Sequence, residues 1–224
     1  MVNNKPQLIL IHGALGNALQ MDVLAQNAKS VYDVYCFQCP YHDGKPVELN
    51  KFTIPHFSNA LLNFITENNL IKPKVFGYSM GGYLALYTQQ IQPVFSKIVT
   101  YGTKFNWSPE AALLETQKLQ PNLIENKVPH FAGLLQAQYG TAWMQVVNAT
   151  AALMHDISLN KYLPDKILNP VVIPVTILVG DNDNMVTLSE TQTATNWFAN
   201  AQMHKVNGQH LLHKVDVTTL LNFI

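Results

Sequence analysis

The sequence predicts an α/β fold: a mostly parallel sheet of about six strands, helices on both faces and an inserted helical cap. Three observations support this prediction. Short apolar runs alternate with longer amphipathic segments along most of the chain. The alternation is interrupted once, between residues 103 and 170, where only helical patterns occur. A Gly-x-Ser-x-Gly sequence joins one apolar run to the helical pattern behind it.

The first half of the chain contains four predicted strands, at residues 7–12, 31–37, 74–78 and 97–101. Each is a short run rich in apolar residues, of the kind that a buried strand needs. Helical patterns occupy residues 18–28, 54–68 and 83–90. In the first of them, Leu19, Val23 and Leu24 are spaced to form the core-facing side.

Residues 103–170 are predicted to form a cap of helices that lies over the sheet. Ser108-Pro109-Glu110 is a typical helix start, and further helical patterns occupy residues 131–138 and 141–156. Strand–helix alternation then resumes with a strand at 175–179, a helix at 188–200, a strand at 203–206 and a final helix at 215–224. Residues 1–102 and 171–224 therefore form the predicted core, interrupted by the cap.

The composition excludes several classes of partner. The chain has 224 residues, 12% of them charged, and a formal net charge of zero, so nothing favours binding to nucleic acid or to an anionic membrane. All basic residues are lysine, and there is no arginine. No apolar run reaches the ~20 residues of a membrane span, and the start does not resemble a signal peptide. We expect a cytoplasmic protein whose partner is a small-molecule substrate; the oligomeric state stays open.

Two cysteines, Cys36 and Cys39, form a Cys-x-x-Cys pair. A redox pair usually opens a helix, which lowers the thiol pKa, but this pair runs into Pro40 with no helical pattern behind it. No second pair completes a zinc site. We expect two reduced, structural thiols and no bound metal.

The Gly-x-Ser-x-Gly sequence predicts a nucleophile. A strand that turns sharply into a helix leaves Ser79 at the apex, and the small residues Gly77, Gly81 and Gly82 permit the close approach of strand and helix. The Met80 N–H then lies in the first helical turn, where donors lack partners and can stabilise an oxyanion.

A serine nucleophile needs a histidine base, and the base needs a partner that holds its tautomer. Such groups gather at the carboxyl ends of parallel strands. Asp183 and His210 follow the fifth and sixth predicted strands, and the order Ser, Asp, His is one of the known triad orders. Asp181 and His213 lie close by in the sequence as rivals for the two roles.

Together these motifs resemble those of the α/β-hydrolase fold superfamily over nearly the whole chain. The resemblance rests on His12-Gly13, Pro40 to Gly44, Gly77 to Gly81, Gly180 to Asp183, and Gly208-Gln209-His210. It implies that Asp183 rather than Asp181 is the catalytic acid, and that Ala14, or failing it Leu15, supplies the second oxyanion N–H. The family's usual first hairpin has no room before residue 7.

The resemblance implies a cofactor-free serine hydrolase, a carboxylesterase acting on a small and largely apolar ester. The same triad serves C–C hydrolases, thioesterases, lactonases and haloperoxidases, and some members of the fold only bind small ligands. The substrate-binding candidates are Leu15, Phe131, Leu135, Trp143 and Met154. Because the apolar cap stretches 131–135 and 143–154 contain no lysine, we expect a pocket without fixed positive charge and a preference for neutral esters.

Overall fold

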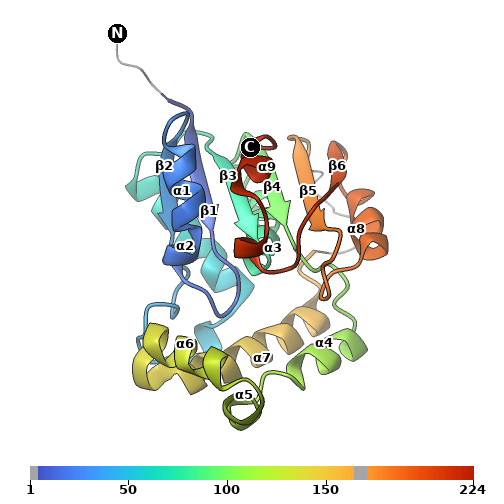
Figure 1. Ribbon diagram of the computed structural model, residues 1–224. Coiled ribbons are helices and arrows are strands. Elements are labelled where there is room, and N and C mark those ends of the chain that lie inside the picture. Colours follow the sequence, from blue (N-terminus) through green and yellow to red (C-terminus); the bar gives the residue numbers. More distant parts are fainter. Residues whose placement is uncertain (1–4, 164–170) are drawn as a thin grey trace.

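A computed structural model of the protein describes residues 5–163 and 171–224. Its centre is a six-stranded, all-parallel sheet with the order β2-β1-β3-β4-β5-β6 (Figure 1). The strands are β1 (Gln7–Ile11), β2 (Asp33–Phe37), β3 (Lys74–Tyr78), β4 (Lys97–Tyr101), β5 (Val175–Gly180) and β6 (Ala201–Val206). The predicted α/β architecture with six parallel strands is confirmed.

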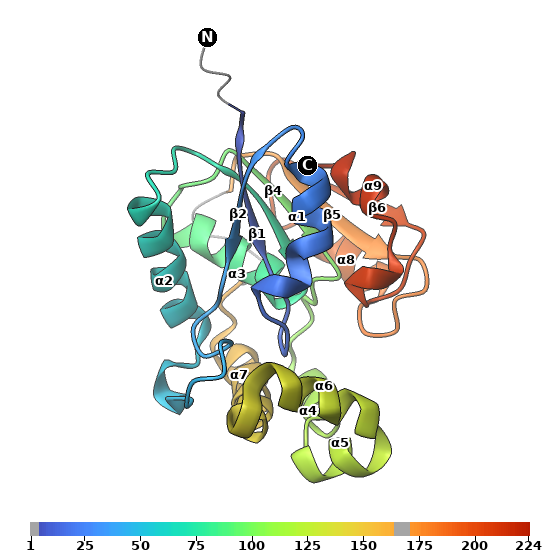
Figure 2. The same cartoon turned by 60° about the vertical axis from the view of Figure 1, so that its left-hand side comes forward.

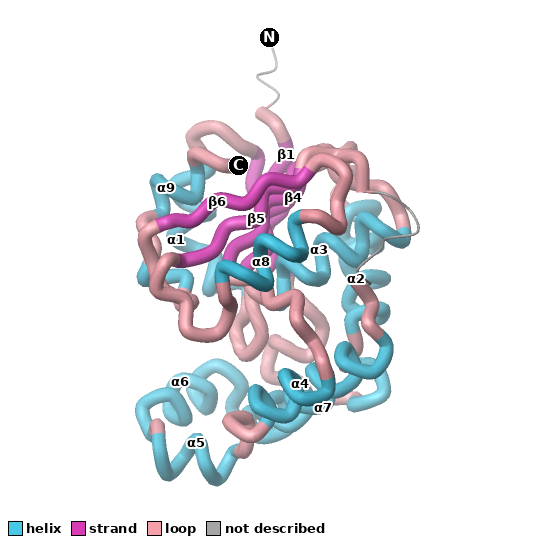
Figure 3. Tube along the Cα trace, turned by 90° about the vertical axis from the view of Figure 1, so that its right-hand side faces the viewer, coloured by secondary structure: helices cyan, strands magenta, loops and turns pink. Residues whose placement is uncertain are grey.

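Helices cover both faces of this sheet. They are α1 (Asp22–Ala28), α2 (Ile54–Glu67), α3 (Met80–Ile91), α8 (Leu188–Thr195) and α9 (Val217–Leu221). Helices α1 and α9 pack on one face, and α2, α3 and α8 pack on the other (Figure 3). Because every connection between strands is a crossover, all carboxyl ends of the strands meet at one edge.

Burial on both faces explains why the strands are continuous apolar runs. In β1, Leu8 and Leu10 join the cluster that contains α1 and α9, whereas Ile9 and Ile11 join the cluster that contains α2 and α3. All four side chains are fully buried. In a strand with one solvent-exposed face, apolar and polar residues would alternate instead. The continuous apolar pattern therefore follows from the helical layer on each face of the sheet.

The cap consists, in its described part, of helices that lie beyond the carboxyl ends of the strands (Figures 1 and 2). They are α4 (Pro109–Thr116), α5 (Pro121–Lys127), α6 (Pro129–Tyr139) and α7 (Trp143–Asn160). Proline at the first position starts α4, α5 and α6, and α5 is a separate helix outside the helical patterns predicted for the cap. The predicted end of the cap at residue 170 lies outside the described residues, and the division into core and cap stays a prediction.

The expected core-facing side of the first helix was wrong. Leu19 and Val23 are 70% and 68% exposed, and only Leu24 is buried. Residues Ala18–Met21 form a 3-10 turn before α1 begins, and its tighter winding rotates the following residues. The side that packs on the sheet therefore contains Met21, Leu24, Ala25 and Ala28.

Cys36 and Cys39 are both free thiols. Burial raises the pKa of each thiol, so neither is the low-pKa thiolate of a redox pair. Within the described ranges, no helix is long and apolar enough to cross a membrane.

Candidate active site

Ser79 lies at the turn between β3 and α3, with backbone angles φ 51° and ψ −114°. A positive φ is strained for a residue with a side chain, and it persists only where the surroundings enforce it. Here the Ser79 N–H donates to the Tyr101 carbonyl at 2.8 Å, and the Thr103 hydroxyl donates to the Ser79 carbonyl at 3.0 Å. Both partners come from β4 and the loop behind it, so the neighbouring strand holds the turn.

The glycines around Ser79 are required by close backbone contacts. A Cβ at Gly77 would lie 2.4 Å from the Gly82 nitrogen, and a Cβ at Gly81 would lie 2.4 Å from the Ile11 carbonyl oxygen. Real Cβ atoms do not approach the backbone so closely. The expectation that strand, turn and helix pass within backbone contact of one another therefore holds.

Asp183 and His210 form a buried pair at the same edge of the sheet. His210 Nδ1 donates to Asp183 Oδ2 at 2.9 Å, and the side chains of Asp183 and His210 are 0% and 8% exposed. Asp183 Oδ1 accepts from the N–H groups of Met185 and Val186 at 2.8 and 2.9 Å. Because Nδ1 carries the proton, Nε2 of the neutral ring is free to accept one.

The environment keeps Asp183 ionised. Burial raises the pKa of its carboxyl group, but the hydrogen bond and charge of His210 and the N–H groups of Met185 and Val186 lower it more. The net result is a pKa below the usual range. The His210 ring packs on Tyr78, the residue before Ser79, with 5.7 Å between ring centroids.

The two rival residues lie elsewhere. Asp181 is exposed, and its Oδ1 accepts from the Gly208 N–H at 3.0 Å, so it braces the loop that carries His210. His213 is exposed in a short 3-10 turn. In the structure the carboxylate–imidazole hydrogen bond joins Asp183 to His210 and involves neither Asp181 nor His213. The catalytic roles of Asp183 and His210 stay predictions.

The loop after β1 brings Ala14 to Ser79. His12 is fully buried, donates from Nδ1 to the Gly13 carbonyl at 2.8 Å and accepts at Nε2 from the Cys39 N–H at 3.1 Å. Burial lowers the pKa of His12 to about 3, so the ring stays neutral and braces the loop. The Tyr139 hydroxyl in α6 donates to the Gly16 carbonyl at 2.6 Å, which ties this loop to the cap.

A small cavity of about 40 Å³ lies between this loop, the start of α3 and helix α7. Ser79, Met80 and Ala14 line one side of it, and Leu153, Met154 and Ile157 line the side formed by α7. The predicted nucleophile and both predicted oxyanion donors therefore share one cavity. Its volume accommodates a few non-hydrogen atoms, and its walls are largely apolar.

Of the five predicted substrate-binding residues, only Met154 lines this cavity. Leu135 and Trp143 are buried in the apolar cluster of the cap itself, and Leu15 packs against that cluster. Phe131 is 38% exposed. These four residues lie outside the lining of this cavity, and their role in substrate binding stays a prediction. The face of a cap helix that meets Ser79 depends on how the helices cross, and α7 presents its second half.

Lys104 also lines the cavity, although the apolar cap stretches that were expected to cover Ser79 contain no lysine. Its side chain is 14% exposed and lies near the carboxylates of Glu115, at 3.7 Å, and Glu190, at 3.9 Å. The expectation of a pocket without fixed positive charge was therefore wrong. Lys104 follows the end of β4 by three residues, and the rule that functional groups gather at the carboxyl ends of strands would have pointed to it.

Among the described residues, no group of three or more His, Cys, Asp or Glu side chains is arranged to hold a metal ion. The polar groups brought together at this edge of the sheet are a strained serine, a histidine held by a buried carboxylate, and the backbone N–H groups at the start of α3.

Comparisons with known proteins agree with this arrangement at the level of the fold. A family model described as alpha/beta hydrolase fold matches residues 6–123, about half of the chain. No curated protein sequence matches the chain.

Many solved structures are similar. A putative lipase from Acinetobacter baumannii is 20% identical, with a TM-score of 0.76, and the match covers 98% of this chain and 82% of that one. The enol-lactonase from Burkholderia xenovorans is 13% identical, with a TM-score of 0.77 and coverage of 99% and 92%. An esterase from Exiguobacterium antarcticum is 13% identical, with a TM-score of 0.75 and coverage of 98% and 92%. At these identities the likeness shows the fold alone.

Proposed function

Because the chain belongs to the α/β-hydrolase fold family, we propose that it is a serine hydrolase that cleaves small, largely apolar carboxylic esters through an acyl-enzyme on Ser79. The observation that carries the proposal is the Asp183–His210 hydrogen bond, buried at the sheet edge that also holds the strained Ser79 turn. A carboxylate that holds Nδ1–H leaves Nε2 as a base, which is what a serine hydroxyl needs at neutral pH.

In this mechanism the Ser79 hydroxyl attacks the ester carbonyl while His210 Nε2 accepts its proton. Asp183 stabilises the imidazolium that forms, and the N–H groups of Met80 and Ala14 donate to the oxyanion. The tetrahedral intermediate collapses when His210 returns the proton to the leaving alcohol. Water, activated in the same way, then attacks the acyl-enzyme and releases the acid.

The size of the cavity supports a short acyl group. About 40 Å³ between Ser79 and α7 holds an acyl chain of only a few carbon atoms unless the cap moves. The walls formed by Leu153, Met154 and Ile157 are apolar. The polar groups of the lining residues Lys104 and Thr150 already donate to backbone carbonyls. A short, unsubstituted acyl ester is therefore the substrate class that we propose.

A fluorophosphonate probe tests the proposal, because it reacts only with an activated serine. We expect a single labelled site at Ser79, and loss of both labelling and esterase activity in Ser79→Ala. Across a series of p-nitrophenyl esters, kcat/KM should be highest for acetyl to butyryl chains and fall for octanoyl. Labelling that survives Ser79→Ala would refute the assignment of the nucleophile.

The same experiment separates the proposal from its main alternatives. A ligand-binding protein on this fold would not react with the probe. A C–C hydrolase, thioesterase, lactonase or haloperoxidase would be labelled, but it would show weak activity across the whole ester series.

A further inference from the structure

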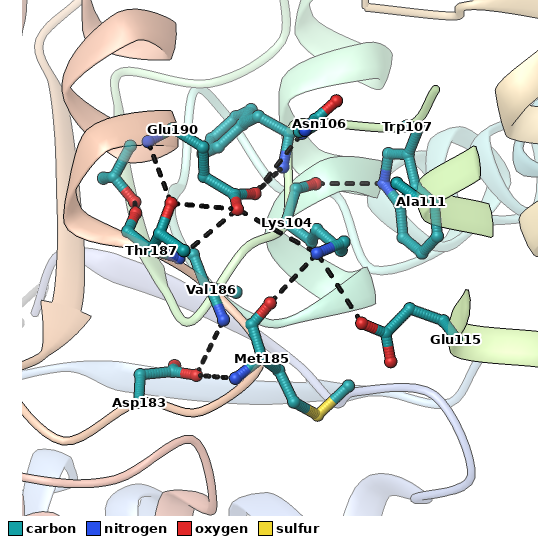
Figure 4. Close-up of polar contacts among 12 residues, drawn as sticks. Lys104, Asn106, Trp107, Ala111, Glu115, Asp183, Met185, Val186, Thr187 and Glu190 are labelled. Atoms are coloured by element: carbon teal, nitrogen blue, oxygen red, sulfur yellow. Dashed lines mark hydrogen bonds and ion pairs between the residues drawn. The ribbon is translucent and has the colours of Figure 1, made fainter. Parts of the chain in front are cut away.

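Lys104 lies at the centre of a group of polar contacts between the cap and the loop that carries Asp183 (Figure 4). Its Nζ donates to the Met185 carbonyl at 3.0 Å. The carboxylates of Glu115 in α4 and Glu190 in α8 lie on its other sides, at 3.7 and 3.9 Å. Of these contacts, only the one to Met185 is within hydrogen-bonding distance. All three charged side chains are at most 14% exposed, so solvent screens them little.

The Met185 carbonyl belongs to the same peptide group as the Val186 N–H. That N–H donates to Asp183 Oδ1 at 2.9 Å, and the Met185 N–H donates to the same oxygen at 2.8 Å. Lys104 thus contacts one end of a rigid, planar peptide whose other end holds the carboxylate. A cation at the carbonyl strengthens the N–H as a donor, because hydrogen bonds in a chain polarise one another.

Glu190 and Glu115 hold the ammonium in this place. Glu190 Oε1 also accepts from the N–H groups of Phe105 and Asn106 at 3.2 and 3.3 Å, so it fixes the backbone that follows Lys104. Glu115 makes a second ion pair with Lys118, at 2.9 Å. Lys118 is 66% exposed and, in the described contacts, interacts with Glu115 and not with the Asp183 loop.

We propose that Lys104 is a positioning residue for the catalytic acid: through the Met185–Val186 peptide it orients Asp183 against His210. The proposal rests on the proposed function, since it gives Asp183 and His210 their roles in catalysis. This role also explains why the buried Lys104 ammonium lies closer to the Met185 carbonyl than to the carboxylates of Glu115 and Glu190.

The test compares Lys104→Met with the matched control Lys118→Met, since each removes one ammonium from Glu115. In Lys104→Met we expect kcat to fall by roughly 10- to 100-fold, as is usual when a partner behind a functional group is lost. KM should change less than kcat, because the Lys104 ammonium, although its side chain lines the cavity, donates to the Met185 carbonyl and is not needed to bind a neutral acyl group. Lys118→Met should keep both constants near those of the wild type.

A second variant separates positioning from stability. Lys104→Met leaves two carboxylates without their shared ammonium, which lowers the melting temperature whatever the role of Lys104. The double variant Lys104→Met/Glu115→Gln removes the excess charge and should recover most of the melting temperature. It cannot supply a donor to the Met185 carbonyl, so kcat should stay low. Recovery of kcat together with stability would overturn the proposal.

Proton NMR gives a measurement that should not change if Lys104 only stabilises the fold. The Nδ1–H proton shared by His210 and Asp183 should give a low-field resonance, assigned by its loss in Asp183→Asn. In Lys104→Met and in the double variant we expect this resonance to shift or broaden. If the wild type is labelled by fluorophosphonate at Ser79 while the variant keeps both the labelling rate and the resonance, only the role of Lys104 is refuted. If the wild type is not labelled, the proposed function itself fails.

Discussion

Replacing Asp183 by asparagine changes the site in a way that the hydrogen bonds define. The backbone N–H groups of Met185 and Val186 both donate to Oδ1, and an asparagine side chain can still accept them with its amide oxygen. Its NH₂ group must then point at His210 Nδ1, where the carboxylate oxygen was at 2.9 Å. Two donors cannot face each other, so Nδ1 must give up its proton.

The consequence is the wrong tautomer. The ring proton moves to Nε2, the atom that should accept the proton of Ser79, and the base is lost without any change in packing. The same substitution in a serine protease triad costs about four orders of magnitude in kcat. Since a tenfold change in rate is about 1.4 kcal/mol, the barrier should rise by about 5.5 kcal/mol. Stability should fall much less, because two of the three hydrogen bonds survive.

The assay is kcat with a short p-nitrophenyl ester, measured beside the melting temperature. Asp181→Asn is the matched control: its Oδ1 accepts from the Gly208 N–H at 3.0 Å, which an amide oxygen can also do, and its side chain lies in water. We expect less than a tenfold loss in the control. A severe loss for Asp181→Asn with a mild one for Asp183→Asn would refute the reasoning from this geometry.

Three further predictions concern packing, pH and charge. Gly77→Ala should lower the free energy of unfolding, measured by urea titration, by about 3 kcal/mol, because the new Cβ would lie 2.4 Å from a backbone nitrogen. Gly133→Ala is the control, since a Cβ there would have no neighbour within 4 Å, and it should not lower the free energy of unfolding. Equal urea midpoints for the two variants would contradict the close contact at Gly77. Burial lowers the pKa of His42 to about 4, so the folded state binds fewer protons than the unfolded state. At pH values above about 6.5, the pKa of histidine in the unfolded state, His42 therefore does not lower the free energy of unfolding. By pH 5 it should have lowered the free energy of unfolding by about 2 kcal/mol. His42→Phe should reduce this acid loss, and an unchanged pH dependence would argue against a buried neutral ring. Finally, Lys104 lies near the carboxylates of Glu115 and Glu190, and Glu115 also pairs with Lys118, so the group of four carries no net charge and leaves no excess positive charge for a substrate carboxylate. A butyryl ester should have a higher kcat/KM than the matched hemisuccinyl ester, and the opposite order would show that Lys104 binds anions.

Much of the candidate site could be predicted because its signals are local. The turn at Ser79 needs glycine on both sides, since strand and helix pass within backbone contact. Asp183 and His210 follow strands, and parallel strands deliver their carboxyl ends to one edge in any fold of this class. No knowledge of remote packing is needed for either inference.

The misplaced residues share a different cause. Leu135 and Trp143 have the same apolar character as Leu153 and Met154, yet the first pair packs inside the cap and the second pair lines the cavity. The choice depends on how α7 crosses the sheet edge, which neighbouring residues do not encode. Exposed Leu19 has a different, local cause, because it lies within the 3-10 turn Ala18–Met21, which does not continue the helical face of α1.

By itself, the sequence determined the α/β architecture, the six parallel strands and the positions of Ser79, Asp183 and His210, because apolar periodicity and glycine at close contacts act over a few residues. Only the tertiary structure decided which cap residues meet Ser79 and that Lys104 reaches the Met185 carbonyl. These contacts join segments about 80 residues apart, and packing complementarity between distant elements, rather than local pattern, selects them.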